Sequence, residues 1–563
     1  MISNLLKWSS SGLPWVWVSA ASVATSLLMV VGLIALLAFR GLSHFWPAEV
    51  IQANYRAVSN TNEVLIAEVV GEFIDTETVS AAQVASTGVR IDSNAEVVQR
   101  QLIKLGNRDI TGTDFVWLIS DFLTGTHYPP EVVTLERTEW GNFYGFLKSL
   151  SVEDGVIMDE GEENSSRLWR EFSDRLERVQ AVQNQIDDIE KRQLADINYR
   201  MQRLLIQERS IVAEGTAGAD ELAQLSTMRN VLDSEYEIQR LRLLSLEQEA
   251  AQDSADFIAV NGDVVTIPLV TIVRAYQPNQ LSLGGKVKVF VSRIGEFLTA
   301  QPREANTEGG VYPAIFGTVM MVLLMSIIVT PLGVITAVYL REYARQGLFT
   351  QMVRVAVNNL AGVPSIVYGV FGLGFFVYFV GAEIDQGFYS QNLPSPTFGT
   401  PGLLWASLTL ALLTVPVVIV ATEEGLARIP ASVREGSLAL GATKFETLWR
   451  VVLPMASPAM MTGLILAVAR AAGEVAPLML VGVVKLAPSL PVDRYYPYLH
   501  LDQKFMHLGF HIYDLGFQSP NIDAATPLIF ATAFLLVAVI ATLNFSAVAL
   551  RNHLREKYKS LDV

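Results

Sequence analysis

Long apolar runs with few charges alternate with polar stretches along this chain, and six of the runs are long enough to cross a bilayer. A hydrocarbon core about 30 Å thick needs roughly 20 apolar residues in a helix. The six runs are 15–39, 311–340, 355–381, 401–422, 455–484 and 524–550. The sequence therefore predicts an all-α polytopic membrane protein with six transmembrane helices. No small-residue cleavage site follows the first run, so we expect it to be retained as an anchor.

The polar stretch between the first two runs is acidic. Residues 41–308 carry 42 Asp and Glu against 24 Lys and Arg, a net charge of −18, whereas the whole chain carries −15. Strands are expected near 60–75 and 131–150, and Asn261-Gly262 predicts a hairpin turn. These patterns predict an α+β insert within a slightly basic membrane protein. The absence of cysteine excludes disulfides and thiolate metal sites.

Part of the insert has helical periodicity. Apolar residues recur at mostly three- and four-residue steps from Leu168 to Leu204, and a second stripe follows a Gly-containing break at 214–218. The second stripe consists of Leu222, Leu225, Met228, Leu232 and Leu241. We expect an antiparallel coiled-coil hairpin at about 165–250. The alternative is two ordinary helices packed on the rest of the insert.

Lys and Arg cluster in alternate loops, and such loops stay in the cytoplasm. The clusters lie at 341–354, 428–450 and 551–559, and Lys7 precedes the first run. Both termini are therefore expected in the cytoplasm and the insert outside it. The expected domains are residues 1–40 (start and first helix), 41–308 (insert), 309–550 (membrane core, with a cytoplasmic loop at 423–456) and 551–563 (tail).

The cytoplasmic loop at 423–456 contains a recognisable pattern. It reads Arg434-Glu435-Gly436-Ser437-Leu438-Ala439-Leu440-Gly441, followed later by Leu453-Pro454. This resembles the EAA loop of ABC importer permeases, in which Glu, Gly and Leu-Pro stand at these positions. Gly436 and Ser437 replace the two alanines of the pattern. The resemblance implies that Arg434, Glu435, Gly436, Ser437, Gly441, Leu453 and Pro454 couple the chain to an ATPase; an ordinary amphipathic loop is the alternative.

Two charges interrupt the fifth apolar run. Arg470 and Glu474 stand four residues apart, a spacing that lets them pair on one helical face. Charges at this depth usually serve a pathway or a partner, and guanidinium groups bind tetrahedral oxyanions. Arg470 is therefore expected to line the substrate path with Glu474 as its counter-charge, or else the two form a structural ion pair.

The segment around this pair resembles the Arg-Ala-x-Gly-Glu-x-Ala-Pro signature of PstA-type phosphate permeases. Residues 309–318 and 359–369 resemble two further motifs of that family, so the resemblance covers 309–484. It implies the ABC importer permease fold in a bacterial inner membrane and import of inorganic phosphate. The implied partners are a second permease of the family, a homodimeric ATPase and a periplasmic phosphate-binding protein. The function of the insert is not implied.

Other functional classes have little support. No Gly-x-x-x-x-Gly-Lys-Ser/Thr loop occurs, so ATP and Mg²⁺ are expected on the partner ATPase, and no catalytic site, cofactor, metal site or nucleic-acid-binding stripe is predicted here. His500, His507 and His511, near Asp502 and Asp514, are expected to be surface or packing residues. Two alternatives stay open: a permease for sulfate, molybdate or phosphonate, and a membrane-anchored coiled-coil scaffold or signalling protein.

Overall fold

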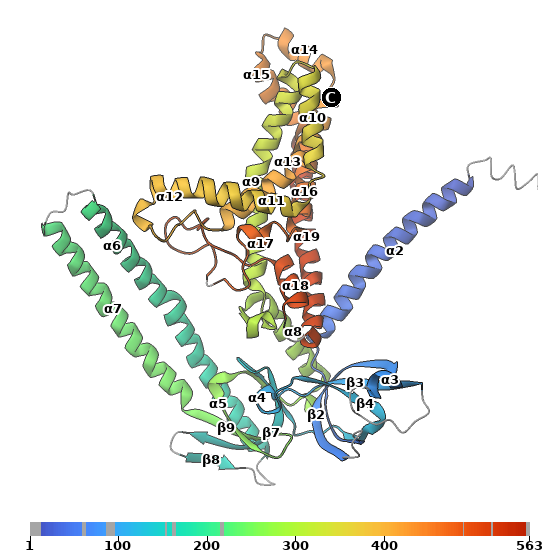
Figure 1. Ribbon diagram of the computed structural model, residues 1–563, viewed down its shortest axis with the longest axis vertical. Helices are drawn as coiled ribbons and strands as arrows, with labels where there is room; N and C mark the ends of the chain where they lie inside the picture. Colours follow the sequence, from blue (N-terminus) through green and yellow to red (C-terminus); the bar gives the residue numbers. More distant parts are fainter. Residues whose placement is uncertain are drawn as a thin grey trace, which may run out of the picture. The chain divides into compact units, whose positions relative to one another are not determined.

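The computed structural model describes residues 13–58, 64–85, 96–152, 155–159, 165–213, 219–487, 489–519 and 522–558. The chain divides into two compact units. Unit 1 comprises Met1–Phe45, Val311–Phe388 and Pro396–Val563, and unit 2 comprises Trp46–Gly310 with Tyr389–Ser395. Figure 1 shows helices in the first unit and sheets with two long helical arms in the second.

Six helices of the described chain are long and apolar enough to cross a membrane. They are Trp15–Ser43, Tyr312–Tyr343, Ser365–Phe388, Leu403–Ala427, Lys444–Gly473 and Ala525–His553. The number of spans agrees with the sequence prediction, and the chain is a multi-pass membrane protein. The boundaries of the third and fifth helices differ most from the prediction. The third helix starts at Ser365 because Pro364 cannot continue the preceding helix, and the fifth ends at Gly473 rather than near Val484.

Unit 1 is built around three packed helices, α9 (Tyr312–Val338), α13 (Leu403–Ala427) and α16 (Leu453–Gly473). Their shared core includes Met321, Met325, Leu410, Leu413 and Ala467. The other helices of the unit are α2 (Leu13–Ser43), α10 (Leu348–Leu360), α11 (Ser365–Phe371), α12 (Ala382–Phe388), α14 (Ala431–Ala439), α15 (Lys444–Thr447), α17 (Leu478–Val481), α18 (Leu508–Phe517) and α19 (Ile522–Tyr558). π-Helical turns at Tyr339–Tyr343, Gly372–Gly381 and Leu448–Val452 extend or join them.

Unit 2 contains two antiparallel sheets, so strands make up more of the chain than the sequence patterns predicted. One sheet has the order β4-β3-β2-β1-β5, and the other has the order β10-β9-β7-β6-β11 with β8 paired to β7. The strands of the first sheet are β1 (Val50–Val58), β2 (Val64–Ser80), β3 (Val97–Lys104), β4 (Phe115–Ile119) and β5 (Leu123–His127). Those of the second are β6 (Val133–Arg137), β7 (Asn142–Val152), β8 (Gly155–Asp159), β9 (Asp253–Ile258), β10 (Val264–Pro268) and β11 (Ile272–Tyr276). Short β12 (Pro302–Arg303) and β13 (Glu308–Gly309) pair with each other.

The predicted hairpin at Asn261-Gly262 is confirmed. β9 and β10 pair antiparallel, and Gly262 adopts φ +82°, a left-handed conformation that glycine reaches without a Cβ clash. The remaining helices of the unit are α3 (Ala81–Ala85), α4 (Arg108–Thr111), α5 (Ser165–Asp188), α6 (Ala195–Ala213), α7 (Ala219–Ala251) and α8 (Leu283–Thr299).

The two helical arms are formed by α5 and α6, joined through a π-helical turn at Ile189–Leu194, and by α7, which contacts both. The predicted stripe of α5 is buried, from Leu168 to Ile186. On α7 the prediction was wrong for Met228 and Leu241, which are exposed, whereas Leu232 is buried. The buried side of α7 does not include these two residues. The predicted turn at 214–218 lies outside the described residues.

Candidate functional site

The segment between α13 and α16 folds as two short helices joined by a sharp turn. α14 (Ala431–Ala439) follows Pro430, and Gly441 then adopts φ +89°. Thr443 caps α15 (Lys444–Thr447) in a capping box with Glu446. The left-handed conformation of Gly441 permits the tight reversal between the helices. We call residues 431–450 the coupling segment.

Some of the predicted coupling residues hold this segment together. The guanidinium of Arg434 bonds Glu342 at 2.9 Å and donates to the Ile429 carbonyl at 2.7 Å. The Ser437 hydroxyl lies 2.9 Å from that of Thr447, which links α14 to the following helix. Leu453 and Pro454 form the first turn of α16 and are partly buried. Arg434 thus anchors the segment to the rest of unit 1, and Ser437 holds its two short helices together.

The other predicted coupling residues lie on the outer surface. Glu435, Gly436 and Gly441 are exposed, and a Cβ at either glycine would meet nothing within 4 Å. Space around this face is therefore open to a partner.

Sequence analysis missed a set of exposed apolar side chains in the coupling segment. Leu440 is 91% exposed, Phe445 67% and Trp449 65%, and Leu438 is also exposed. The Phe445 and Trp449 rings stack with centroids 6.3 Å apart. We call these four residues the apolar patch. In the sequence, the patch is visible only as large apolar residues within a loop rich in charged residues. Helical periodicity alone does not distinguish these residues. Large apolar side chains on an open surface are typical of a protein interface.

Arg470 and Glu474 do approach each other. Arg470 Nε lies 3.5 Å from Glu474 Oε1, with the side chains 35% and 21% exposed. The expectation of one shared helical face was wrong, because α16 ends at Gly473 and Glu474 has an extended backbone (ψ 133°). The pair therefore spans the end of the helix.

The chain is irregular beyond this pair, between α16 and α17 (Leu478–Val481). Neighbouring helices approach the irregular stretch closely: a Cβ on Gly369 would lie 2.7 Å from Pro477 Cα. Glycine at 369 is therefore required for the packing of α11 on this stretch. An interrupted helix is the usual means of presenting polar groups at membrane depth.

The histidines do not form a metal site in the described part of the chain, where no group of three suitable ligands occurs. His500 Nε2 lies 2.9 Å from Asp493 Oδ1. His507 and His511 are buried, and burial lowers the pKa of each to about 4. Asp514, on the same helix as His511, pairs with Lys485 at 3.2 Å. His507 and His511 are therefore packing residues, as expected.

Comparisons with known proteins identify the family of this chain. Residues 329–560 match the family described as binding-protein-dependent transport system inner membrane component. The phosphate transport system permease protein PstA 1 of Mycobacterium tuberculosis is 33% identical over 244 residues, which cover 43% of this chain and 71% of that protein. The probable ABC transporter permease protein YqgH of Bacillus subtilis is 33% identical over 35% of this chain and 62% of its own length. A solved inward-facing MetNI methionine ABC transporter covers 43% of this chain and 94% of its own, with 19% identity and a TM-score of 0.32. The chain belongs to the family of binding-protein-dependent transport system inner membrane components, as a permease of the PstA type.

Proposed function

We propose that this chain is a permease subunit of an ATP-driven importer of inorganic phosphate in a bacterial inner membrane. The PstA-type relatives support the substrate, and the exposed apolar patch of the coupling segment is the structural observation that supports the coupling. A permease of this family is not itself an enzyme. In the proposal ATP and Mg²⁺ bind a separate homodimeric ATPase, and this chain carries no cofactor.

The proposed assembly contains a second permease of the family and a periplasmic phosphate-binding protein. The basic loops support cytoplasmic termini, with residues 41–308 forming a periplasmic domain and 309–550 forming the permease core. Within that domain, the paired arms α5–α6 and α7 are proposed to be an antiparallel coiled coil.

The mechanism follows from how the coupling segment is attached. It exposes the apolar patch and Glu435, Arg434 attaches it to Glu342 in the rest of unit 1, and the bond between Ser437 and Thr447 holds its two short helices together. A movement of the ATPase would therefore pull on α13 and α16 together, because the segment joins their ends. α16 carries Arg470 at its far end, so the same movement reaches the proposed substrate path.

Leu440→Asp tests the coupling. Leu440 buries almost nothing in this chain, so we expect an unchanged melting temperature. Recruitment of the ATPase, measured by co-purification, and phosphate uptake are both expected to fall at least about tenfold, because a carboxylate would be desolvated in the interface. Leu283→Asp, at another highly exposed leucine, in α8, is the control and should leave both unchanged. Normal ATPase recruitment by Leu440→Asp would refute the proposed contact.

Arg470→Gln tests the substrate path. Loss of the charge removes a bidentate anion partner, so uptake of labelled phosphate into proteoliposomes is expected to fall about tenfold or more while the ATPase stays bound. Competition by sulfate, molybdate and phosphonate identifies the preferred anion in the same assay. Unimpaired uptake by an assembled Arg470→Gln transporter would remove Arg470 from the path and leave a structural ion pair.

A further inference from the structure

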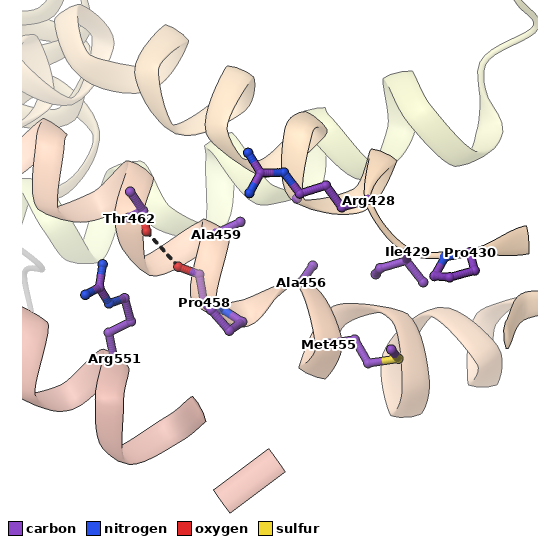
Figure 2. Close-up of a pocket in the computed structure, with 10 residues that line it drawn as sticks. Arg428, Ile429, Pro430, Met455, Ala456, Pro458, Ala459, Thr462 and Arg551 are labelled. Carbon is purple, nitrogen blue, oxygen red and sulfur yellow. Dashed lines mark hydrogen bonds between the residues drawn. The ribbon is translucent and has the colours of Figure 1, made fainter. Parts of the chain in front are cut away.

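A pocket of about 480 Å³ lies in unit 1 where α13, α16 and α19 meet. Figure 2 shows its lining, with Arg428 from the end of α13, Arg551 from α19, and Thr462 and Ala459 of α16 between them in the view. Neither Arg470 nor Glu474 lines it. The pocket is therefore distinct from the proposed substrate path.

The charge of this pocket is unbalanced. Its lining contains two arginines and no acidic residue. Two other arginines of this unit have carboxylate partners: Arg354 pairs with Glu423 at 3.1 Å and Arg434 with Glu342 at 2.9 Å. Among the residues that the structure describes, no carboxylate lies within ion-pair distance of Arg428 or Arg551. Two cations facing one recess repel each other, and a bound anion removes that cost.

The walls of the pocket are held in place by close packing. A Cβ on Gly425 would lie 2.4 Å from the Ala459 Cβ, so α13 and α16 touch directly beside the pocket. The Thr462 hydroxyl bonds the Pro458 carbonyl at 2.9 Å, which fixes a polar atom on the same wall. The recess is thus a property of the helix packing rather than of one side-chain rotamer.

We propose that this pocket binds a phosphate group between the guanidinium groups of Arg428 and Arg551. A guanidinium fork offers parallel hydrogen bonds to two phosphate oxygens, and two forks match a doubly charged group. The volume accommodates a phosphate with its attached glycerol or with water. The group is carried either by inorganic phosphate or by the headgroup of an anionic phospholipid. Because it would join the ends of three helices beside the coupling segment, its binding stabilises the arrangement of that segment.

Direct binding to the purified full-length protein tests the proposal independently of transport. In one arm the protein is placed in phosphatidylcholine nanodiscs, and binding of labelled inorganic phosphate is measured. In the other arm the nanodiscs contain phosphatidylglycerol, and retained lipid is counted by native mass spectrometry. The variant combines Arg428→Gln with Arg551→Gln. Arg345→Gln, at an exposed arginine outside the pocket, is the control.

We expect the double variant to lose about tenfold or more in affinity in one arm, while the control matches the wild type in both. Loss in the first arm identifies free phosphate as the ligand, and loss in the second identifies the lipid. If the double variant has a lower melting temperature than the wild type, Arg428→Lys combined with Arg551→Lys retains both charges. This lysine variant should still bind the phosphate group, but several-fold more weakly than the wild type, because an ammonium group cannot form the bidentate contact. Wild-type binding by the variants in both arms overturns the proposal, whether or not the protein transports phosphate.

Discussion

The two units bury polar groups in different ways. In unit 2, charges are inside: Glu136 lies between Arg274 and Arg293, with Arg293 Nε 2.7 Å from its carboxylate. In unit 1, most of the buried polar side chains that the structure describes are hydroxyls, and Thr318, Ser407 and Thr414 donate to the carbonyls four residues earlier in their own helices. A helix in lipid must satisfy its polar groups internally and gains most from close packing of small residues. Ion networks therefore define the core of one unit, and backbone proximity defines that of the other.

The largest expected effect is at the ion network. Glu136→Ala removes the buried carboxylate that pairs with the partly buried Arg274 and Arg293, and removing one partner of a buried pair costs about 3–5 kcal/mol. Hydrogen exchange of β6 and β11 should rise accordingly, while exchange in unit 1 stays unchanged. Glu77→Ala breaks the partly exposed pair with Arg100 and should cost less than about 1 kcal/mol. Equal effects of the two variants would contradict the contrast between buried and exposed charges.

A smaller effect is expected at a packing glycine of the membrane unit. A Cβ on Gly317 would lie 2.1 Å from the Met506 carbonyl oxygen, and backbone cannot rotate aside as a side chain can. Gly317→Ala should cost about 2–3 kcal/mol, read as a lower melting temperature in detergent and faster exchange in α9. Gly374→Ala is the control, since nothing lies within 4 Å of the added atom. A tolerated Gly317→Ala would mean that helix proximity does not determine stability here.

The same contrast explains what could be predicted from the sequence. The six spans and the Gly441 turn follow from local composition and a residue that permits positive φ, so they were predictable. The side of α7 that is buried was not, because the exposure of Met228 and Leu241 depends on how α7 packs against α5 and α6.

Candidate-site predictions divide in the same way. The spacing of Arg470 and Glu474 indicated their proximity, but the end of α16 between them depends on how the following irregular stretch packs. Leu440 and Trp449 had no periodic pattern, and only the three-dimensional surface shows that they are left uncovered.

Acid should affect the two units in different pH ranges. His507 and His511 lie outside the six spans, and their pKa values of about 4 are below the unfolded value near 6.5. Their stabilising contribution is complete above pH 6.5 and is lost as the pH falls towards 4. In unit 2, the Arg137 guanidinium lowers the pKa of Asp109. The stabilising contribution of this pair is therefore lost only when the pH falls below the usual pKa range of an aspartate. Burial raises the pKa of Glu308, whose protonation favours folding as the pH falls.

Unit 1 should therefore weaken first. Between pH 8 and pH 6 each buried histidine is expected to cost about 1 kcal/mol, from the difference between its folded and unfolded pKa. The groups facing His511 act in opposite directions, since Asp514 favours its protonation and Lys485 opposes it. Hydrogen exchange in α18 should accelerate at pH 6 beyond the intrinsic pH dependence of exchange, while the sheets of unit 2 stay protected. In His511→Gln the acceleration should be about half as large on a free-energy scale. An unchanged pH dependence in that variant, or earlier loss of protection in unit 2, would show that buried neutral groups do not limit the acid stability of the membrane unit.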